Sequence, residues 1–322
     1  MVPHAPSFLD AWVSAATEPG GFWAAEVPSA HFRTASTLGP ELADAVAALL
    51  RDRPEVGRVV ELGAGEGALL RGLGAVRPDL ALVGVDVRGR PPGLAGALGW
   101  VGDRWDVRGD RWADGAVPDL LADGPPTLVL AVEWLDDLPC PVVSRTGTGW
   151  HELDADLEPR GVPAAADEAW LRRWWPDGER AEVGRTRDAA WAAVVRALAG
   201  GPGGAALAVD YGHERGSRPP AGSVAAFRAG RAVAPRPRAD RNLTAHVALD
   251  AVAAAGTAAG ARTVLVGRQA EVLPRLLPPV PPSADPLAAL AARSRRQALT
   301  APAGWGAHRW LLQEVAAGAV AP

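Results

Sequence analysis

Apolar residues along this chain fall into short continuous runs that alternate with segments of helical spacing. The runs at 58–62, 80–85, 127–132 and 205–209 have the length and aliphatic content of strands that are buried on both faces. Between two such runs, or before them, apolar positions recur every three or four residues, as at 40–50, where Pro54 then closes the helical pattern. This alternation predicts an α/β fold with a mostly parallel, doubly wound sheet.

The same patterns predict the remaining elements. Residues 5–55 are expected to be mainly helical, and the segments 142–145 and 150–153 flank a TGTG turn that is typical of a hairpin. Further helices are predicted at 168–175, 185–198 and 243–254, and further strands at 263–267 and 309–314. We therefore predict an N-terminal helical cap (1–55), the first half of a Rossmann-like domain (56–145), an inserted hairpin and helical segment (146–202) and the second half of the domain (203–322).

The composition is that of an ordinary globular protein. The 322 residues (33.3 kDa) can form one large domain or two modest ones, and the net charge of −4 gives no electrostatic footprint for nucleic acid or an anionic membrane. No apolar run of about eighteen residues is present, and the first ten residues lack the form of a signal peptide. We predict a cytoplasmic protein without nucleic-acid or membrane partners, with a homodimer as the candidate assembly.

Two residue types exclude several kinds of chemistry. Cys140 is the only cysteine, so the chain has no intramolecular disulfide and no multi-thiolate metal site, and a buried packing role is expected for this thiol. The sequence contains no lysine, which excludes pyridoxal-phosphate Schiff bases and the P-loop. The histidines show no paired spacing of metal ligands, and we predict no metal.

The most informative segment is ELGAGEG, residues 61–67. A strand ends in Glu61, and Gly63, Gly65 and Gly67 then alternate before a helix begins. Glycines at these positions let the chain turn sharply and bring bare backbone against a ligand. Because ligands of open α/β sheets bind at the carboxyl ends of the strands, this turn predicts a site for a nucleotide-like cofactor.

The spacing of the glycines separates two cofactor classes. The dinucleotide fingerprint is G-x-G-x-x-G, whereas the pattern here is one residue shorter. Glu61 would repel a pyrophosphate but attract the ammonium of an amino-acid moiety, which favours S-adenosylmethionine (SAM). Asp86 ends the next strand and is expected to accept hydrogen bonds from both ribose hydroxyls, although it fits either cofactor. Ala64, Val87 and Val132 are predicted to line the same site, with Asp106 as a candidate partner of the adenine amino group or, alternatively, a solvated strand edge.

Groups that serve methyl transfer should lie at strand ends beside the cofactor. The reaction needs alignment, exclusion of water and help for the acceptor to lose a proton. Glu133 and Asp136, which follow the strand at 127–132, meet this demand, because a carboxylate there could take a proton or hold a guanidinium by paired hydrogen bonds. The alternative for Asp136 and Asp137 is a structural role at a helix N-terminus, where acidic side chains interact favourably with the helix dipole.

Several segments in order resemble the MidA-like class I SAM-dependent methyltransferases, a family that includes the mitochondrial complex I assembly factor acting as a protein arginine methyltransferase. ELGAGEG resembles the family's SAM loop and AVEWLDDLP (131–139) its ANExxDALP signature. The other matching segments are GFW (21–23) for GYY, HFRTAS (31–36) for DFxTAPE, EVGR (182–185), VDYG (209–212) for IDYG, GSVAAF (222–227) for GTLRAY and NLTAHV (242–247) for DITAHV. The resemblance spans most of the chain.

The resemblance implies a class I methyltransferase fold with a seven-stranded sheet, and methyl transfer to a protein side chain, arginine first. It also implies that residues at matching positions shape the acceptor pocket: Thr34, Asp210, Tyr211, Arg215, Asn242 and His246. The chain departs from the family at three positions. Val132 stands where the family has Asn, Asn242 where it has Asp, and Ala248 where it has a further Asp.

Three other functions remain open at this stage. A small-molecule O- or N-methyltransferase would share the SAM loop, and Val132 favours it slightly. A non-catalytic SAM-binding assembly factor is suggested by the polar groups lost at 132, 242 and 248. A nicotinamide-dependent oxidoreductase is disfavoured by the glycine spacing.

Overall fold

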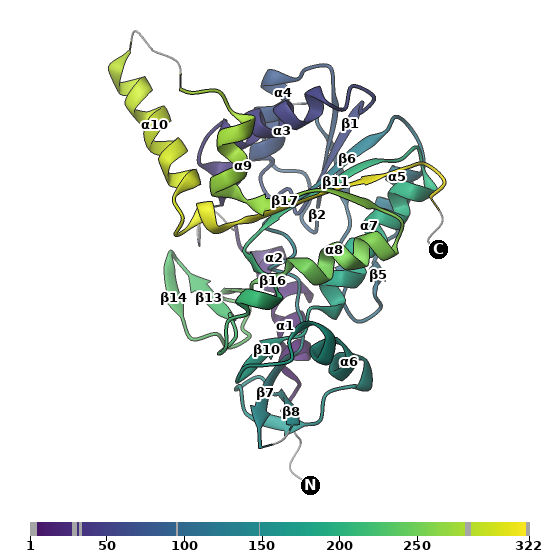
Figure 1. Cartoon of the computed structure of the whole chain (residues 1–322), viewed down its shortest axis with the longest axis vertical. Coiled ribbons are helices and arrows are strands. Elements are labelled where there is room, and N and C mark those ends of the chain that lie inside the picture. Colours follow the sequence, from purple (N-terminus) through teal and green to yellow (C-terminus); the bar gives the residue numbers. More distant parts are fainter. Residues whose placement is uncertain are drawn as a thin grey trace.

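A seven-stranded sheet forms the centre of the molecule (Figure 1). The computed structural model describes residues 5–27, 31, 34–94, 96–147, 149–280 and 285–319. Within these ranges the strands lie in the spatial order β17, β18, β11, β6, β1, β2, β3, and β18 runs opposite to the other six. The strands are β1 (Arg58–Leu62), β2 (Ala81–Asp86), β3 (Gly99–Gly102), β6 (Thr127–Val132), β11 (Gly204–Asp210), β17 (Arg262–Arg268) and β18 (Arg309–Val315). The predicted seven-stranded, mostly parallel α/β sheet is confirmed.

Helices cover both faces of this sheet. Side chains of β6 alternate between them: Leu128 and Leu130 pack toward one helical layer, and Val129 and Ala131 toward the other. This double burial explains the continuous apolar run in the sequence. The first layer is α3 (Glu41–Arg51), α4 (Ala68–Val76) and α9 (Gln269–Leu276); the second is α5 (Ala116–Ala122), α7 (Arg185–Gly200) and α8 (Leu249–Ala258).

A smaller unit lies below the central sheet in Figure 1. Its four strands have the order β10, β7, β8, β9, and the predicted hairpin is confirmed as β7 paired with β8. Phe8 and Trp12 pack with Cys140 and Leu153 in its core. The unit contains β7 (Val142–Thr146), β8 (Gly149–Leu153), β9 (Pro159–Gly161), β10 (Arg180–Glu182), α1 (Phe8–Thr17) and α6 (Ala165–Trp174).

These elements divide the chain differently from the predicted regions. The predicted insertion, 146–202, begins at the last residue of β7 and includes α7, although α7 packs on the central sheet. The predicted cap, 1–55, is not one unit either, because α1 packs with the smaller unit and α3 covers the central sheet.

Short elements connect the two parts. The helix predicted at 243–254 is wrong in its first half: that segment is extended, and the helix α8 begins only at Leu249. The reason is tertiary pairing, since Leu243 pairs with Ala226 and the Ala245 amide donates to the carbonyl of Asp136. The short elements are α2 (Phe22–Ala25), η2 (Ala35–Thr37), β4 (Trp105–Asp106), β5 (Arg111–Trp112), β12 (Gly212–His213), η3 (Arg215–Ser217), β13 (Ala225–Arg228), β14 (Arg231–Val233), β15 (Asn242–Thr244), β16 (Val247–Ala248) and η4 (Trp305–Ala307). The longer helix α10 (Pro286–Thr300) packs against α9 and η4.

The topology brings distant segments to one edge of the sheet. The carboxyl ends of β1, β2, β6 and β11 meet there, and the antiparallel β18 begins at the same edge, with Arg309 opposite Asp210. In the described ranges, no helix has both the length and the apolar character that crossing a bilayer requires.

Candidate functional site

The glycine turn after β1 is built as the sequence predicts, but its three glycines differ in role. All three have positive φ, at 64°, 58° and 71° for Gly63, Gly65 and Gly67. A Cβ at Gly63 would lie 2.8 Å from the Trp134 ring, and one at Gly67 would lie 2.9 Å from Leu94. At Gly65 the nearest atom, on Arg88, is 3.9 Å away. Gly65 is therefore the glycine that leaves room for a ligand, whereas its neighbours allow close packing.

This turn borders a cavity at the carboxyl edge of the sheet, with about 1250 Å³ of empty space that includes its open mouth. A cavity of this size accommodates a nucleoside with an attached amino acid. Its lining combines residues from the strand ends, the N-terminal segment and the loops after β3 and β6. They are Thr17, Trp23, Thr34, Ser36, Thr37, Glu61, Leu62, Gly63, Ala64, Gly65, Glu66, Ala68, Val85, Asp86, Val87, Arg88, Asp103, Arg104, Trp105, Trp112, Val132, Glu133, Trp134, Asp137, Leu138 and Pro139.

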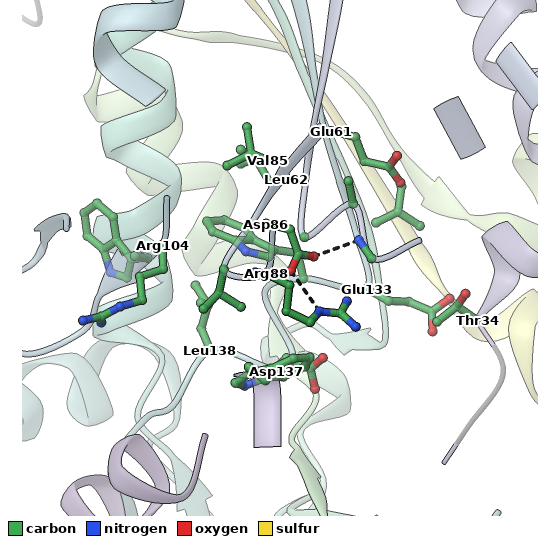
Figure 2. A pocket seen from close by; sticks show the side chains of 18 of the residues that line it. Thr34, Glu61, Leu62, Val85, Asp86, Arg88, Arg104, Glu133, Asp137 and Leu138 are labelled. Carbon is green, nitrogen blue, oxygen red and sulfur yellow. Dashed lines mark hydrogen bonds and ion pairs between the residues drawn. The ribbon is translucent and has the colours of Figure 1, made fainter. Parts of the chain in front are cut away.

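Asp86 connects the glycine turn after β1 to the segment after β2. We call this part of the cavity the cofactor half. One carboxylate oxygen accepts the Gly65 N–H at 2.8 Å, and the other accepts the Arg88 N–H at 2.9 Å and faces the Arg88 guanidinium at 3.2 Å (Figure 2). A carboxylate offers about four lone-pair positions, so it can still accept from a ribose hydroxyl. Asp86 therefore lies where the sequence predicts a ribose partner.

Glu61 faces the same cavity as a buried acid. Its Oε2 atom has no hydrogen-bond partner among the described residues. Burial, and next the nearby Asp86 carboxylate, raise the pKa of Glu61 to about 8. An orphaned buried carboxyl oxygen beside a turn with room for a ligand fits the ammonium of an amino-acid moiety, since that cation would supply both a donor and a compensating charge.

An aromatic wall closes the cavity near the loop after β3. Trp112 stacks on Trp134 at 5.9 Å and meets Trp105 edge-on at 5.6 Å. Asp103 accepts three backbone N–H groups that fix this loop and the start of α5. Asp106, predicted beside the adenine, is outside the lining; its carboxylate accepts the Arg108 N–H and pairs with Arg111. The structure thus favours the solvated strand edge for Asp106.

Glu133 directly follows β6 and lines the cavity. Its backbone has a positive φ of 49°, and its N–H donates to the Val209 carbonyl. The carboxylate accepts the Ala35 N–H at 2.7 Å and lies 3.6 Å from Nε2 of His308. Burial raises the pKa of Glu133 to about 8, and the Asp136 carboxylate adds to this although the Ala35 hydrogen bond opposes it. This strained, nearly buried acid is a candidate proton acceptor.

The second predicted catalytic acid, Asp136, does not face the cavity; Asp137 does. Asp136 is buried and accepts the Thr244 hydroxyl at 2.6 Å. Asp137 lines the cavity and accepts the side-chain amide of Asn242 at 3.0 Å. Burial raises the pKa of Asp137 well above its usual value, and Asp136 adds to the effect. Asp137, and not the predicted Asp136, is therefore the second acid that lines the cavity.

The residues predicted to shape the acceptor pocket are only partly brought together. Thr34 lines the cavity, and the adjacent Phe32 and Arg33 of the HFRTAS segment lie outside the described residues. Asp210 is fully buried and accepts the N–H groups of Leu135 and Asp136, so it shapes the loop rather than the cavity.

The aromatic members of that set form a layer behind Glu133. Tyr211 packs on His308 at 4.0 Å and on His246 at 5.9 Å, and neither Tyr211 nor His246 lines the cavity. Arg215 borders a separate small hollow together with Arg218. Arg215 is thus not part of this site.

The acceptor half of the cavity is the part lined by Glu133 and Asp137. Its loops are joined by a buried arginine that the sequence analysis missed. The Arg187 side chain is 1% exposed and donates to four backbone carbonyls, of Asp136, Leu138, Ala245 and His246. These bonds tie the segment after β6 to the segment after β15. The segments that resemble the family's ANExxDALP and DITAHV signatures are therefore in contact through Arg187.

Two further predictions concern metal and thiol chemistry. Among the described residues no three His, Cys, Asp or Glu side chains cluster as metal ligands. Cys140 is buried, and burial raises the pKa of its thiol to about 11, which keeps it protonated. The predicted packing role of Cys140 is confirmed.

Comparison with known proteins identifies the family. A family model described as "Putative S-adenosyl-L-methionine-dependent methyltransferase" matches residues 104–266, just over half of the chain. No curated protein matches the sequence.

Two solved structures, both from Burkholderia thailandensis, share the fold over 98% of this chain and 90% of theirs. One is described as a "likely methyl transferase" bound to S-adenosyl-homocysteine (TM-score 0.75, 22% identity), and the other is a native structure from the same superfamily (TM-score 0.72, 23% identity). At these identities the likeness shows a shared fold. The match of the family model shows that this chain belongs to the S-adenosyl-L-methionine-dependent methyltransferases that the model describes.

Proposed function

We propose that this protein transfers a methyl group from SAM to a protein side chain, with arginine as the preferred acceptor. The observation that carries the proposal is the pair of carboxyl groups, Glu133 and Asp137, on the acceptor side of the cavity. No ion pair among the described residues joins either group to an arginine. Buried acids without a cationic partner favour a cationic ligand, and a guanidinium can form paired hydrogen bonds with a carboxylate.

The assignment of positions within the cavity supports SAM as the methyl donor. Glu61 would hold the ammonium, Asp86 the ribose, and Val87 with the tryptophan wall the adenine. The S-adenosyl-homocysteine bound to the first relative supports the same use of this cavity. When bound, SAM supplies an electrophilic methyl group whose transfer leaves the bonding electron pair on sulfur. The residues of this chain exclude water, align the acceptor and take its proton at Glu133.

The segments that resemble the MidA-like family support arginine as the acceptor. Trp23 from the GFW segment, Thr34 from HFRTAS and Glu133 from EWLDDLP all line the cavity, so three separate signatures converge on one site. Two of the three departures from the family have different surroundings. The Asn242 side chain donates a hydrogen bond to the Asp137 carboxyl group. Ala248 packs in the core of the smaller unit and does not line the cavity.

The test is to incubate the purified protein with methyl-labelled SAM and an extract of cells that lack it, and to separate labelled protein from labelled small molecules. We expect label in protein and, after hydrolysis, in methylarginine. Glu133→Gln keeps the hydrogen bond from Ala35 but not the base, so transfer should fall by about 10²-fold or more. Binding of SAM, measured by calorimetry, should change by no more than about threefold.

A small-molecule acceptor is the second candidate, because Val132 presents an apolar side chain to the cavity where the resembled family has Asn. Label confined to the small-molecule fraction, and lost in Glu133→Gln, would establish that function in place of protein methylation. SAM binding that survives Glu133→Ala, with no label in either fraction, would instead identify a non-catalytic binding protein.

A further inference from the structure

His308 lies directly behind Glu133, in a position that the catalytic assignment does not yet use. It follows η4 and precedes β18, whose antiparallel direction makes it begin at the edge where the parallel strands end. The side chain is 0% exposed and packs against the Tyr211 ring at 4.0 Å. A fully buried histidine in this place has a fixed orientation.

The hydrogen bonds of His308 define its tautomer. Nδ1 lies 2.8 Å from the carbonyl oxygen of Trp305, and since a carbonyl only accepts, Nδ1 carries the hydrogen. Burial lowers the pKa of His308 to about 4, so the ring is neutral and Nε2 presents a lone pair. Nε2 is buried and has no hydrogen-bond partner among the described residues. The Glu133 carboxyl oxygen, at 3.6 Å, faces it.

The charges around this pair favour a neutral acid over a carboxylate. Asp136, in the segment after β6, and Asp210, the last residue of β11, are buried nearby, and repulsion between these carboxylates and Glu133 keeps a proton on the cluster. Asp137 and Glu133 repel each other in the same way, and the remaining groups around the pair are neutral: the Ala35 amide, the Tyr211 phenol, the Trp305 carbonyl and the His246 ring, whose pKa burial also lowers. A protonated Glu133 has one O–H to donate, and Nε2 is an acceptor to which no other described residue donates.

We propose that His308 is a positioning residue for methyl transfer, whose neutral Nε2 accepts the O–H of Glu133 after Glu133 has taken the acceptor's proton. This inference rests on the proposed role of Glu133 as base. In the proton step, the N–H bond of the acceptor breaks, an O–H bond forms on Glu133, and the carboxyl group becomes neutral. The imidazole gains no proton, so no buried imidazolium forms. The 3.6 Å separation shortens to a hydrogen bond when the acid forms, as catalytic contacts often do on loading.

An acceptor for the acid form has a measurable consequence. It stabilises protonated Glu133 relative to the carboxylate and so raises the pKa of that group, which strengthens it as a base. A purely structural His308, which only fills space and ties down Trp305, would leave the pKa of Glu133 unchanged by substitutions that preserve packing.

Two variants separate these roles. His308→Asn places an amide N–H where Nδ1 donates to Trp305 but puts no acceptor at the Nε2 position. His308→Gln reaches the Nε2 position with an amide oxygen but gives up the Trp305 bond. The proton-accepting role predicts that Asn is the damaging change and that Gln restores part of the function, whereas the structural role predicts the reverse order.

The deciding experiment is an infrared difference titration of the Glu133 carboxyl in the full protein without ligand, with Glu133→Gln as the blank. We expect His308→Asn to lower the pKa of Glu133 by about 0.5 to 1 pH unit, the effect of losing one hydrogen bond, and His308→Gln to lower it less. Thermal unfolding and SAM binding serve as checks that both variants fold. An unchanged pKa in a folded His308→Asn variant would overturn the inference.

The same variants in the methyl-transfer assay give an independent readout. We expect kcat of His308→Asn to fall about tenfold and the acid limb of its pH profile to move to lower pH. A lowered Glu133 pKa together with no methyl acceptor would contradict the proposed function but support the coupling of the two side chains. Methyl transfer with an unshifted Glu133 pKa and pH profile in His308→Asn would support the proposed function but contradict the role of His308.

Discussion

The two halves of the cavity are built on opposite principles. In the cofactor half, Asp86 is bound to the Gly65 amide and to Arg88. In the acceptor half, the hydrogen bonds that Glu133 and Asp137 receive from the described residues are one amide each, from Ala35 and Asn242. The first half is thus arranged around a paired acid, with Glu61 as a buried acid that still favours a cation, whereas in the second half the ionised forms of both Glu133 and Asp137 are disfavoured until a cation comes.

The two halves therefore differ in how much buried charge the folded state has to accommodate. Backbone turns and the paired Asp86 shape the cofactor half, and its electrostatic cost comes from the buried Glu61. The acceptor half buries several carboxyl groups, and the Arg187 guanidinium is the buried cation that holds its loops together through carbonyl bonds. We expect substitutions in the acceptor half to act mainly on folding and turnover, and substitutions in the cofactor half to act mainly on binding.

The largest expected effect comes from Arg187→Met. It removes a buried cation and leaves four backbone carbonyls without their donor, so the free energy of unfolding should fall by about 3–5 kcal/mol. Chemical denaturation measures this. Arg185→Met is the matched control two residues earlier, since Arg185 is 39% exposed and pairs with the exposed Asp110 and the buried Asp167; it should cost about 1–2 kcal/mol, less than Arg187→Met.

If Arg187→Met were as stable as Arg185→Met, the acceptor half would not depend on a central cation, and the contrast between the two halves would fail.

Asp86→Ala should give the next largest effect, on cofactor binding. The change removes the carboxylate that orders Gly65 and faces the ribose, so SAM affinity should fall about tenfold to a hundredfold, as expected for hydrogen bonds to a charged group. Calorimetric titration gives the value. Asp106→Ala is the control, because Asp106 lies outside the lining, and its affinity should match that of the unchanged protein. Equal losses of SAM affinity in both variants would show that Asp106 does contribute to the cofactor site.

The cofactor half could be predicted from the sequence because its signals are local. Glu61, Gly63 and Gly65 belong to one strand and the turn after it, and Asp86 ends the next strand, so position along the chain nearly fixes position in space. The central sheet is predictable for the same reason, since continuous apolar runs such as 127–132 are strands buried on both faces.

The acceptor half could not be predicted in the same way, because it depends on turns and on long-range packing. The positive φ at Glu133 redirects the chain after β6, and Asp137 reaches the cavity while Asp136 turns toward Thr244. His308 and Arg187 are far from that segment in sequence. Only the antiparallel course of β18 brings His308 beside Tyr211, and no local pattern announces that direction.

The smallest effect, and the most specific to the contrast, is the pH dependence of Glu61. Because the pKa of Glu61 is raised to about 8 from 4.5, the empty protein holds this group protonated at neutral pH. A bound ammonium favours the ionised form, so binding below pH 8 must expel a proton. Affinity for S-adenosylhomocysteine, which has the ammonium but no sulfonium, should rise about fivefold between pH 7 and pH 8 and then level off, as the ionised fraction of Glu61 does. Glu61→Gln should remove this slope, measured by calorimetry in buffers of different protonation enthalpy.

The same group makes an opposite contribution to the stability of the empty protein. A carboxyl group with a raised folded-state pKa contributes stability that is complete below its unfolded-state pKa, near 4.5, and is lost as the pH rises through about 8. The Tm of the empty protein should therefore fall between pH 5 and 8, less steeply in Glu61→Gln, and the ligand should restore most of the loss at pH 8. A binding slope that persists in Glu61→Gln but disappears in Glu133→Gln would assign the expelled proton to the acceptor half, and the cofactor half would then contain no uncompensated acid at all.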